Sequence, residues 1–155
     1  MIINSFDDAY VDSGARNKNY GSATTLRIDN SPRVYEIYMR PLGIDAIPPN
    51  TTIEHAVLRL QAHNGGDAAE VRQVTGAWAE NTIKYNNKPG SGGVVSQFPT
   101  TAGVVEIDVT AIVQAWADGA PAHGVRLRSN GSNGSDFYSS ENASSRPELH
   151  VWYAQ

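Results

Sequence analysis

The sequence predicts an all-β domain of two packed sheets, and three observations support this prediction. Several short segments alternate apolar and polar residues with a period of two, as half-buried strands do. Clusters of turn-forming residues separate these segments, and the chain contains 14 glycines and 8 prolines. Its 155 residues correspond to one ordinary domain. We therefore expect a single sandwich module over residues 1–155.

The strands are expected where alternation allows one face of a segment to be buried. These segments are residues 26–29, 56–61, 105–109, 125–128 and 149–153. The turn clusters between them are residues 14–21, 30–32, 48–50, 64–67, 86–93 and 130–135. When the apolar faces of such strands pack against one another, they form two layers.

One segment, residues 110–118, has a helical rather than a strand pattern. Either Asp108 or Thr110 could cap its beginning, and Gly119 could end it in a left-handed conformation. A second and weaker helical turn is expected around Trp78. The apolar residues that fall on one side of the first helix are Ile112, Val113 and Trp116. The first segment is therefore predicted to be a short helix that covers the sandwich.

Charge and composition exclude several classes of protein. The 12 basic and 16 acidic residues give a net charge of -4, opposite to the basic surface that nucleic acid requires. The absence of cysteine excludes disulfide frameworks, thiol catalysis and cysteine metal sites. No apolar run approaches the roughly 18 residues of a membrane span, and residues 1–4 lack the features of a signal peptide. We expect neither nucleic acid nor a membrane as partner.

Motifs of enzymes are also absent. The sequence contains no phosphate-binding glycine loop and no serine nucleophile motif. Pairs of carboxylates can hydrolyse glycosidic bonds, but with 16 acidic residues such pairs are expected by chance. The carboxylates considered are Glu80, Glu106, Asp108, Asp136 and Glu141. The four histidines, which have no metal-binding spacing and are each interpreted as isolated surface or core residues, are His55, His63, His123 and His150. We therefore expect a protein without catalytic activity.

The densest acidic cluster, Asp7, Asp8 and Asp12, is the one candidate metal site. Loops of β-sandwiches bring carboxylates close to backbone carbonyls, and oxygen ligands of this kind suit Ca²⁺. The cluster does not match an EF-hand loop, and aspartates at the start of a strand also serve as solvated turn formers. Apart from this Ca²⁺ site, no cofactor is expected.

A series of motifs covers nearly the whole chain in a fixed order. In the first half they are Asp8-Ala-Tyr-Val-Asp, Asn19-Tyr-Gly-Ser-Ala-Thr-Thr-Leu and Ala56-Val-Leu-Arg-Leu. In the second half they are Val74-Thr-Gly-Ala-Trp-Ala-Glu, Ile83-Lys-Tyr-Asn-Asn-Lys-Pro, Ile107-Asp-Val-Thr-Ala-Ile-Val-Gln-Ala-Trp, Gly124-Val-Arg-Leu-Arg, Ser139-Ser-Glu-Asn and Arg146-Pro-Glu-Leu. Their common order resembles that of the DNRLRE-domain family, which overlaps with carbohydrate-binding module family 96.

The resemblance implies a jelly-roll-like β-sandwich of two antiparallel sheets, with the one short helix near residues 110–118. It also implies a non-catalytic module of extracellular enzymes or adhesins, with polysaccharide binding in some members. Within its motifs we interpret Trp78 and Trp116 as core residues and Glu80 as a structural hydrogen-bond acceptor. Residues 35–42 depart from the family pattern, so the inward residues of that strand are not assigned.

The function expected first is surface-displayed binding or adhesion, with a polysaccharide or surface glycan as partner. Sugars pack their CH groups on exposed aromatic rings and pair their hydroxyls with planar polar groups. The candidate ligand-binding residues are Asn17, Tyr20, Asn86, Asn87, Arg128, Tyr138, Asn142 and Trp152. Because the net charge is negative, long-range attraction of acidic polysaccharides is weak. The residues that could still form a local basic patch are Arg16, Lys18, Arg27 and Arg33.

The alternative is a phage virion protein, either a capsid decoration or a fibre-associated module. The chain begins at Met1 without a signal sequence and ends at Gln155, just after the last predicted strand, so we expect either a module excised from a longer protein or a complete protein that reaches the outside without secretion. Virion proteins reach the outside by lysis. In this interpretation residues 1–3 or an exposed strand edge contact capsid or fibre protein in symmetric copies, for assembly or host attachment. The expected location is extracellular or on a virion surface. A glycan-active enzyme is the third alternative.

Overall fold

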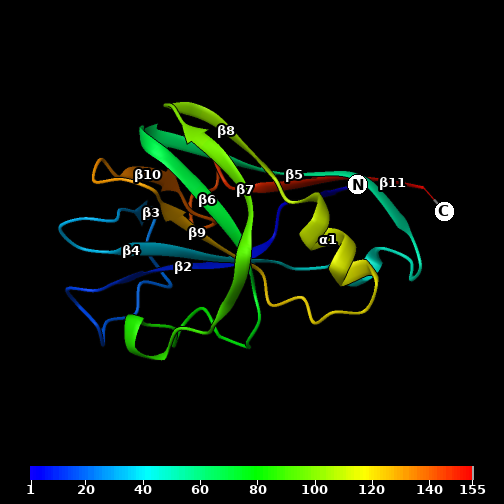
Figure 1. The fold of residues 1–155 in the computed structure, drawn as a ribbon, viewed down its shortest axis with the longest axis horizontal. Coiled ribbons are helices and arrows are strands. Elements are labelled where there is room, and N and C mark those ends of the chain that lie inside the picture. Colours follow the sequence, from blue (N-terminus) through cyan, green and yellow to red (C-terminus); the bar gives the residue numbers. More distant parts are fainter. Residues whose placement is uncertain (155) are drawn as a thin grey trace.

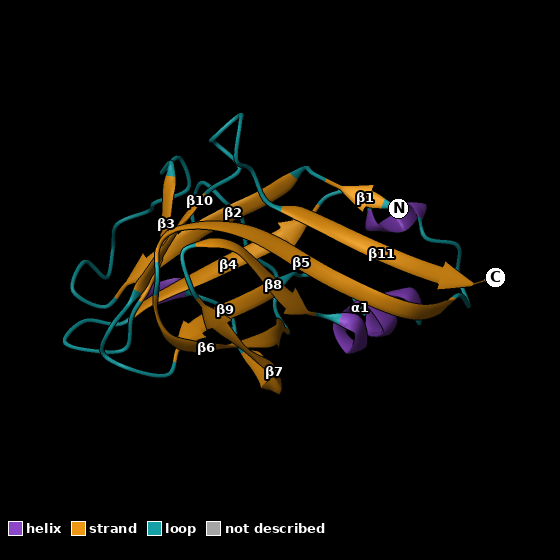
Figure 2. Cartoon of the chain, turned by 90° about the horizontal axis from the view of Figure 1, so that it is seen from above, coloured by secondary structure: helices purple, strands orange, loops and turns teal. Residues whose placement is uncertain are grey.

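The computed structural model describes residues 1–154 as two antiparallel β-sheets that pack face to face (Figure 1). Both chain termini lie at the end of the sandwich that carries the helix, and strand-connecting loops gather at the other end (Figure 2). The predicted β-sandwich with one short helix is therefore confirmed. Within residues 1–154, no helix is long and apolar enough to cross a membrane.

The larger sheet has six strands: β1 (Ile2–Ile3), β3 (Thr25–Ile28), β5 (Thr52–Asn64), β8 (Gly103–Asp108), β10 (Ser135–Tyr138) and β11 (Glu148–Ala154). Their order is β1-β11-β5-β10-β3, with β8 also paired to β5. Val57 pairs with both β8 and β11, and Ala62 pairs with both β8 and β10. Strands β10 and β11 therefore follow one another along one edge of β5, opposite β8.

The smaller sheet has five strands, in the order β2 (Phe6–Asp12), β4 (Tyr35–Pro41), β9 (Val125–Ser129), β6 (Gly66–Val74) and β7 (Ser91–Thr100). The turn predicted over residues 86–93 is wrong in its last part, because residues 91–93 begin β7. Gly92 and Gly93 carry no side chain, so this part of the strand shows no alternation. β7 is an edge strand whose pairing with β6 is interrupted by register shifts, an arrangement in which glycine is common.

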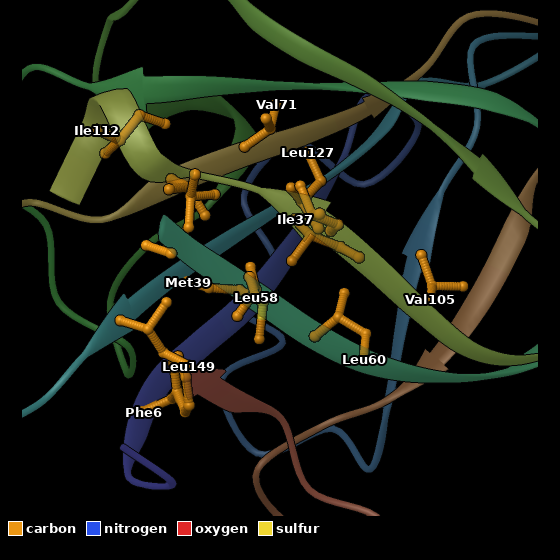
Figure 3. Packing of buried hydrophobic residues seen from close by; sticks show 14 of the residues in the cluster. Phe6, Ile37, Met39, Leu58, Leu60, Val71, Val105, Ile112, Leu127 and Leu149 are labelled. Carbon is orange, nitrogen blue, oxygen red and sulfur yellow. The ribbon is translucent and has the colours of Figure 1, made fainter. Parts of the chain in front are cut away.

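All five alternating segments form strands, and their apolar side chains meet between the two sheets. Figure 3 shows Ile37 and Met39 of β4 in the same core as Leu58 and Leu60 of β5. These four side chains are at most 3% exposed. Because full burial of such a side chain contributes roughly 1.5–3 kcal/mol, this core is the main source of stability.

Helix α1 (Thr110–Ala117) packs against β5 at one end of the core. Val109 occupies the N-cap position, and Asp108 Oδ1 accepts hydrogen bonds from the N–H and hydroxyl of Thr110. Gly119 follows the helix at φ 110°, the left-handed conformation expected at its end. The buried residues of the helix are the three predicted, Ile112, Val113 and Trp116.

The helical turn predicted around Trp78 is displaced along the chain. The Ile83 N–H donates to the Ala79 carbonyl (2.9 Å), and the 3-10 helix η2 (Tyr85–Asn87) follows. A further 3-10 helix, η1 (Ile44–Ala46), precedes β5. Trp78 itself belongs to no helix, because tertiary packing determines the conformation around it.

Residues 75–90, which we call the cover loop, lie over the outer side of the smaller sheet and enclose a second apolar cluster. Trp78 is 9% exposed in this cluster, and its ring meets that of Tyr38 edge-on at 6.0 Å. Trp116 is 7% exposed in the main core, so both tryptophans are core residues as predicted. The full second cluster is Ala9, Val11, Tyr38, Val74, Trp78 and Ile83.

Charged residues beneath the cover loop are paired with one another. Glu36 is fully buried and forms ion pairs with Lys88 of the cover loop and with Arg126 of β9 (3.2 Å). Arg126 also lies 3.8 Å from Glu70 of β6. We call the outer side of the smaller sheet, together with the cover loop, the sealed face.

Candidate functional site

The outer side of the larger sheet carries polar and aromatic side chains that reach solvent, and we call it the open face. Successive side chains of a strand point to opposite sides of a sheet, so every second residue of β5 and β11 belongs to this face. The residues of the open face that matter here are His55, Arg59, Gln61, His63, Glu106, Asp136, Tyr138, Glu148, His150 and Trp152.

A stack of aromatic rings lies at the end of the open face nearest the helix. Trp152 is 51% exposed and pairs across the strands with His55. The two rings are 5.6 Å apart at an angle of 25°, and the ring of His150 lies 6.1 Å from the indole at 29°. Thr110 Oγ1 of the helix lies 3.4 Å from His55 Nδ1. The imidazoles therefore orient the indole without burying it.

A polar groove occupies the middle of the open face, where the loop between β10 and β11 leaves the sheet. It is lined by Arg59 and Gln61 of β5, by Val104 of β8 and by loop residues 143–146. Within the described chain, Arg59 Nε is buried without a hydrogen-bond acceptor, and Glu106 Oε2 lies 3.9 Å from it. The Arg59 side chain as a whole is 39% exposed, so its terminal N–H groups can donate to a ligand oxygen in the groove.

A second aromatic group lies toward the loop end of the open face. The ring of Tyr138 is 4.6 Å from that of His63, and Arg27 of β3 lies 3.8 Å from Asp136. The structure thus brings two predicted ligand residues, Tyr138 and Trp152, to one side of one sheet. Because a strand rises about 3.3 Å per residue, the two aromatic groups are separated by roughly 26 Å along β5.

Three predicted ligand residues, Asn17, Asn86 and Asn87, lie in loops on the sealed side of the molecule. Asn86 Nδ2 donates to Asn17 Oδ1 (2.7 Å), which joins the cover loop to the loop after β2. Asn87 accepts from the Lys84 N–H (2.7 Å) and donates to the Thr82 carbonyl (3.0 Å), so that it closes η2. The structure does not bring these asparagines to the open face.

Tyr20 and Arg128 also lie apart from the open face. The ring of Tyr20 stacks on that of Tyr10 with centroids 4.2 Å apart, and Tyr10 belongs to the main core. Arg128 lies on β9 of the smaller sheet and donates to Asn30 Oδ1 (2.8 Å). Both side chains are therefore engaged by other groups of the protein.

Asn142 is nearer to the open face, in the loop whose residues 143–146 line the groove. Its Oδ1 accepts hydrogen bonds from the backbone N–H groups of Ser144 (3.1 Å) and Ser145 (2.9 Å). A side chain that bonds the backbone two and three residues ahead fixes a turn. Asn142 shapes the groove through this turn.

The structure does not bring together the three aspartates predicted as a cation site. Asp7 and Asp8 are successive residues of β2, so their side chains diverge. Each aspartate has its own partner: Asp7 pairs with Arg40, Asp8 accepts hydrogen bonds from Ser140, and Asp12 pairs with Arg33. Residues 1–154 contain no group of three or more His, Asp or Glu side chains that could hold a metal ion. Calcium binding stays a prediction from the sequence.

Asp8 anchors the loop between β10 and β11, which flanks the groove. Its carboxylate accepts hydrogen bonds from the N–H (2.8 Å) and the hydroxyl (2.7 Å) of Ser140, and its own N–H donates to Glu80 Oε1 (3.4 Å). Burial raises the pKa of Asp8 to about 6 and the pKa of Glu80 to about 7. Glu80 is thus the hydrogen-bond acceptor that the sequence predicted.

Sequence reasoning missed the side chains that surround Trp152 and the groove. The histidines were interpreted one at a time, although Arg59 and Gln61 lie on the polar side of the predicted strand 56–61 and His55 directly precedes it. The neighbour of that strand is β11, about ninety residues later in the chain. No local pattern identifies this partner, so the stacking of His55 and His150 on Trp152 becomes visible only in the folded chain.

The chain matches a known protein family over nearly its whole length. The model of carbohydrate-binding module family 96 matches residues 1–153, a range that includes both sheets, the helix and the cover loop. No curated protein sequence matches the chain. The match confirms the resemblance that the ordered motifs indicate, and it extends over the open face as well as the sealed face.

Proposed function

The chain belongs to carbohydrate-binding module family 96, and we propose that it binds a polysaccharide along its open face without catalysing a reaction. The observation that carries this proposal is Trp152, which remains 51% exposed although it stacks between two histidines. An exposed aromatic ring of fixed orientation is the group on which the CH side of a sugar packs. Polar groups beside it then select the hydroxyls.

The shape of the open face favours an extended chain over a single sugar. Glu148, His150 and Trp152 are alternate residues of β11, so they form a row about 13 Å long that leads from the aromatic stack to the groove. Arg59 and Gln61 continue the polar surface along β5. A row of this length exceeds one sugar ring, so several units of a polysaccharide would lie along it.

Binding without catalysis is supported by the surroundings of the carboxylates considered from the sequence. Glu106 and Asp136 of the open face lie beside Arg59 and Arg27. Glu80 accepts a backbone hydrogen bond at the Asp8 anchor. Carboxylates in these roles position other groups and contribute polar contacts. Display at an extracellular or virion surface, including the phage role, stays a prediction from the sequence.

Replacement of Trp152 tests the proposed function. Affinity electrophoresis in gels that contain soluble polysaccharides should show retention of the native chain on at least one of them. Trp152→Ala should weaken that binding by at least about tenfold, because a central aromatic contact contributes more than about 1 kcal/mol. The free energy of unfolding should change by less than about 0.5 kcal/mol, because the side chain is exposed.

The matched control is Leu42→Ala, which removes another exposed apolar side chain (43%) outside the open face. This variant should keep the retention of the native chain. If the native chain is folded and is retained by no polysaccharide, neutral or acidic, the proposed function is wrong. If Trp152→Ala and Leu42→Ala weaken binding equally, the binding surface is not the open face.

A further inference from the structure

One hydroxyl group links the helix to the aromatic stack of the open face. Thr110, the first residue of α1, places its Oγ1 3.4 Å from Nδ1 of His55, whose ring stacks on that of Trp152. The same oxygen lies 2.7 Å from Asp108 Oδ1 and 3.0 Å from the backbone nitrogen of Ala56. Groups of β5 and β8 therefore meet at the Thr110 hydroxyl.

The hydrogen bonds of this hydroxyl determine which nitrogen of His55 carries the hydrogen. A hydroxyl has one hydrogen to donate and two lone pairs that accept. The hydrogen goes to the Asp108 carboxylate at 2.7 Å rather than to the Ala56 carbonyl at 3.5 Å, because a charged acceptor forms the stronger bond. The side-chain and backbone hydrogen bonds from Thr110 hold the pKa of Asp108 below its usual range. One lone pair accepts the Ala56 N–H, so the other is left for His55, whose Nδ1 then carries the hydrogen.

A neutral imidazole with its hydrogen on Nδ1 has an acceptor at Nε2. His55 is exposed, and within residues 1–154 its Nε2 makes no hydrogen bond. His150, the other imidazole of the stack, is held by the opposite nitrogen, since its Nε2 lies 3.3 Å from Glu148 Oε1 and donates to it. The two rings beside the indole therefore present different nitrogens for a ligand.

From this geometry we infer that Thr110 holds His55 in the Nδ1–H tautomer, so that Nε2 accepts a hydrogen bond from a hydroxyl of the sugar that packs on Trp152. Thr110 is then a positioning residue, a role that rests on the proposed function. Every sugar unit carries hydroxyl donors, and the imidazole ring is centred 5.6 Å from the indole. A hydroxyl at the rim of a sugar that covers the indole is therefore within reach of Nε2. In the other tautomer Nε2 would be a donor instead.

Imidazole nitrogen NMR tests the tautomer directly. Long-range 1H–15N correlation spectra distinguish a ring nitrogen that carries hydrogen from one that does not, and pH 8 lies above the range in which histidine usually titrates. In the native chain His55 should show the Nδ1–H form and His150 the Nε2–H form. Thr110→Val keeps the shape of the side chain without the hydroxyl, so His55 should lose its preference for the Nδ1–H form. Thr110→Ser keeps the hydroxyl and should keep this form.

Affinity electrophoresis tests the role of Nε2 in binding. The probes are a soluble β-glucan, an unsubstituted xylan and a polyuronate, and the one that retains the native chain most strongly serves for the variants. His55→Phe keeps a ring beside Trp152 and removes both nitrogens, so its binding should fall about fivefold, the size of one uncharged hydrogen bond. The control variant Leu42→Ala should bind like the native chain. With the same probe added, the Nε2 resonance of His55 should shift in the native chain.

The outcomes separate the role of Thr110 from the proposed function. An Nε2–H form of His55 in the native chain overturns the inference, even where Trp152 is needed for retention. Full retention of His55→Phe overturns it as well. If no probe retains the folded chain, the proposed function is wrong and Nε2 has no sugar to bind. The Nδ1–H form in the native chain and in Thr110→Ser, together with weaker binding of His55→Phe, supports both.

Discussion

The sealed face and the open face each hold a tryptophan on the outer side of a sheet, and the two side chains have opposite surroundings. Trp78 packs on the smaller sheet from the cover loop, is 9% exposed and donates its Nε1–H to the His123 carbonyl (2.6 Å). Trp152 belongs to the larger sheet itself and is 51% exposed between His55 and His150. The same residue type therefore packs into an apolar cluster at one face and remains half exposed at the other.

Charged residues of the two faces differ in burial in the same way as the two tryptophans. Glu36 of the sealed face is fully buried between Lys88 and Arg126, whereas the Glu106 side chain of the open face is 60% exposed beside Arg59. A buried ion pair depends on both partners, because a lone buried charge is very unfavourable. An exposed pair is screened by water and contributes little. Burial, and not residue type, separates the structural groups of this sandwich from those that we propose bind a ligand.

The largest expected effect is the loss of stability in Trp78→Ala. Removal of a buried tryptophan leaves a cavity and should lower the free energy of unfolding by about 3–5 kcal/mol. The second apolar cluster would lose its largest member, and the cover loop would detach before the main core unfolds. Urea unfolding followed by fluorescence measures the change. A loss no larger than that of Trp152→Ala would contradict the distinction between the two faces.

A smaller decrease in the free energy of unfolding is expected for Glu36→Ala. Lys88 is partly exposed and can turn to water, but Arg126 cannot do so as easily, since its side chain is 13% exposed. The expected loss is about 3 kcal/mol, at the lower end of the range for a broken buried pair. The matched control, Glu106→Ala, should cost less than about 1 kcal/mol. Equal losses in the two variants, measured by urea unfolding, would contradict the proposed role of burial.

Much of the fold could be predicted from local patterns. Strands that bury one face, such as residues 56–61 and 149–153, alternate clearly because the core imposes a period of two. The helix could also be predicted from the sequence, because its three core residues lie on one side of the helix. β7 was not predicted as a strand, and its beginning was assigned to a turn, because Gly92 and Gly93 carry no side chain that could show alternation.

The candidate site could be predicted only in part. Tyr138 and Trp152 were chosen as aromatic candidates for sugar packing, and the structure places both on the open face. Asn17, Asn86 and Asn87 belong to turns, where asparagine closes the backbone, and composition alone cannot distinguish this role from sugar binding. The groove beside Arg59 depends on where β10 and β11 meet along β5, which is a property of the topology.

The smallest expected effect is a change of stability with pH at Asp8, which anchors the loop between β10 and β11. Burial raises the pKa of Asp8 from 3.8 to about 6 and that of Glu80 from 4.5 to about 7. A carboxyl group whose pKa is raised by folding binds its proton more tightly in the folded chain. Its contribution to stability is therefore complete below the unfolded pKa and is lost as the pH rises through the folded pKa. Between about pH 7 and about pH 4, acidification should stabilise the chain.

Asp8→Asn isolates the part of this dependence that belongs to the anchor. The uncharged amide can still accept a hydrogen bond from the Ser140 N–H, so the loop should stay in place while the titration at this position disappears. The variant should gain stability near pH 7, by at most about 2–3 kcal/mol for a shift of this size, and should show a weaker pH dependence of the urea midpoint. Asp45→Asn, at an exposed acid, should leave both unchanged. If Asp8→Asn lowers stability near pH 7, the charged form of Asp8 anchors the loop, and the groove is built on an ionised carboxylate like those of the sealed face.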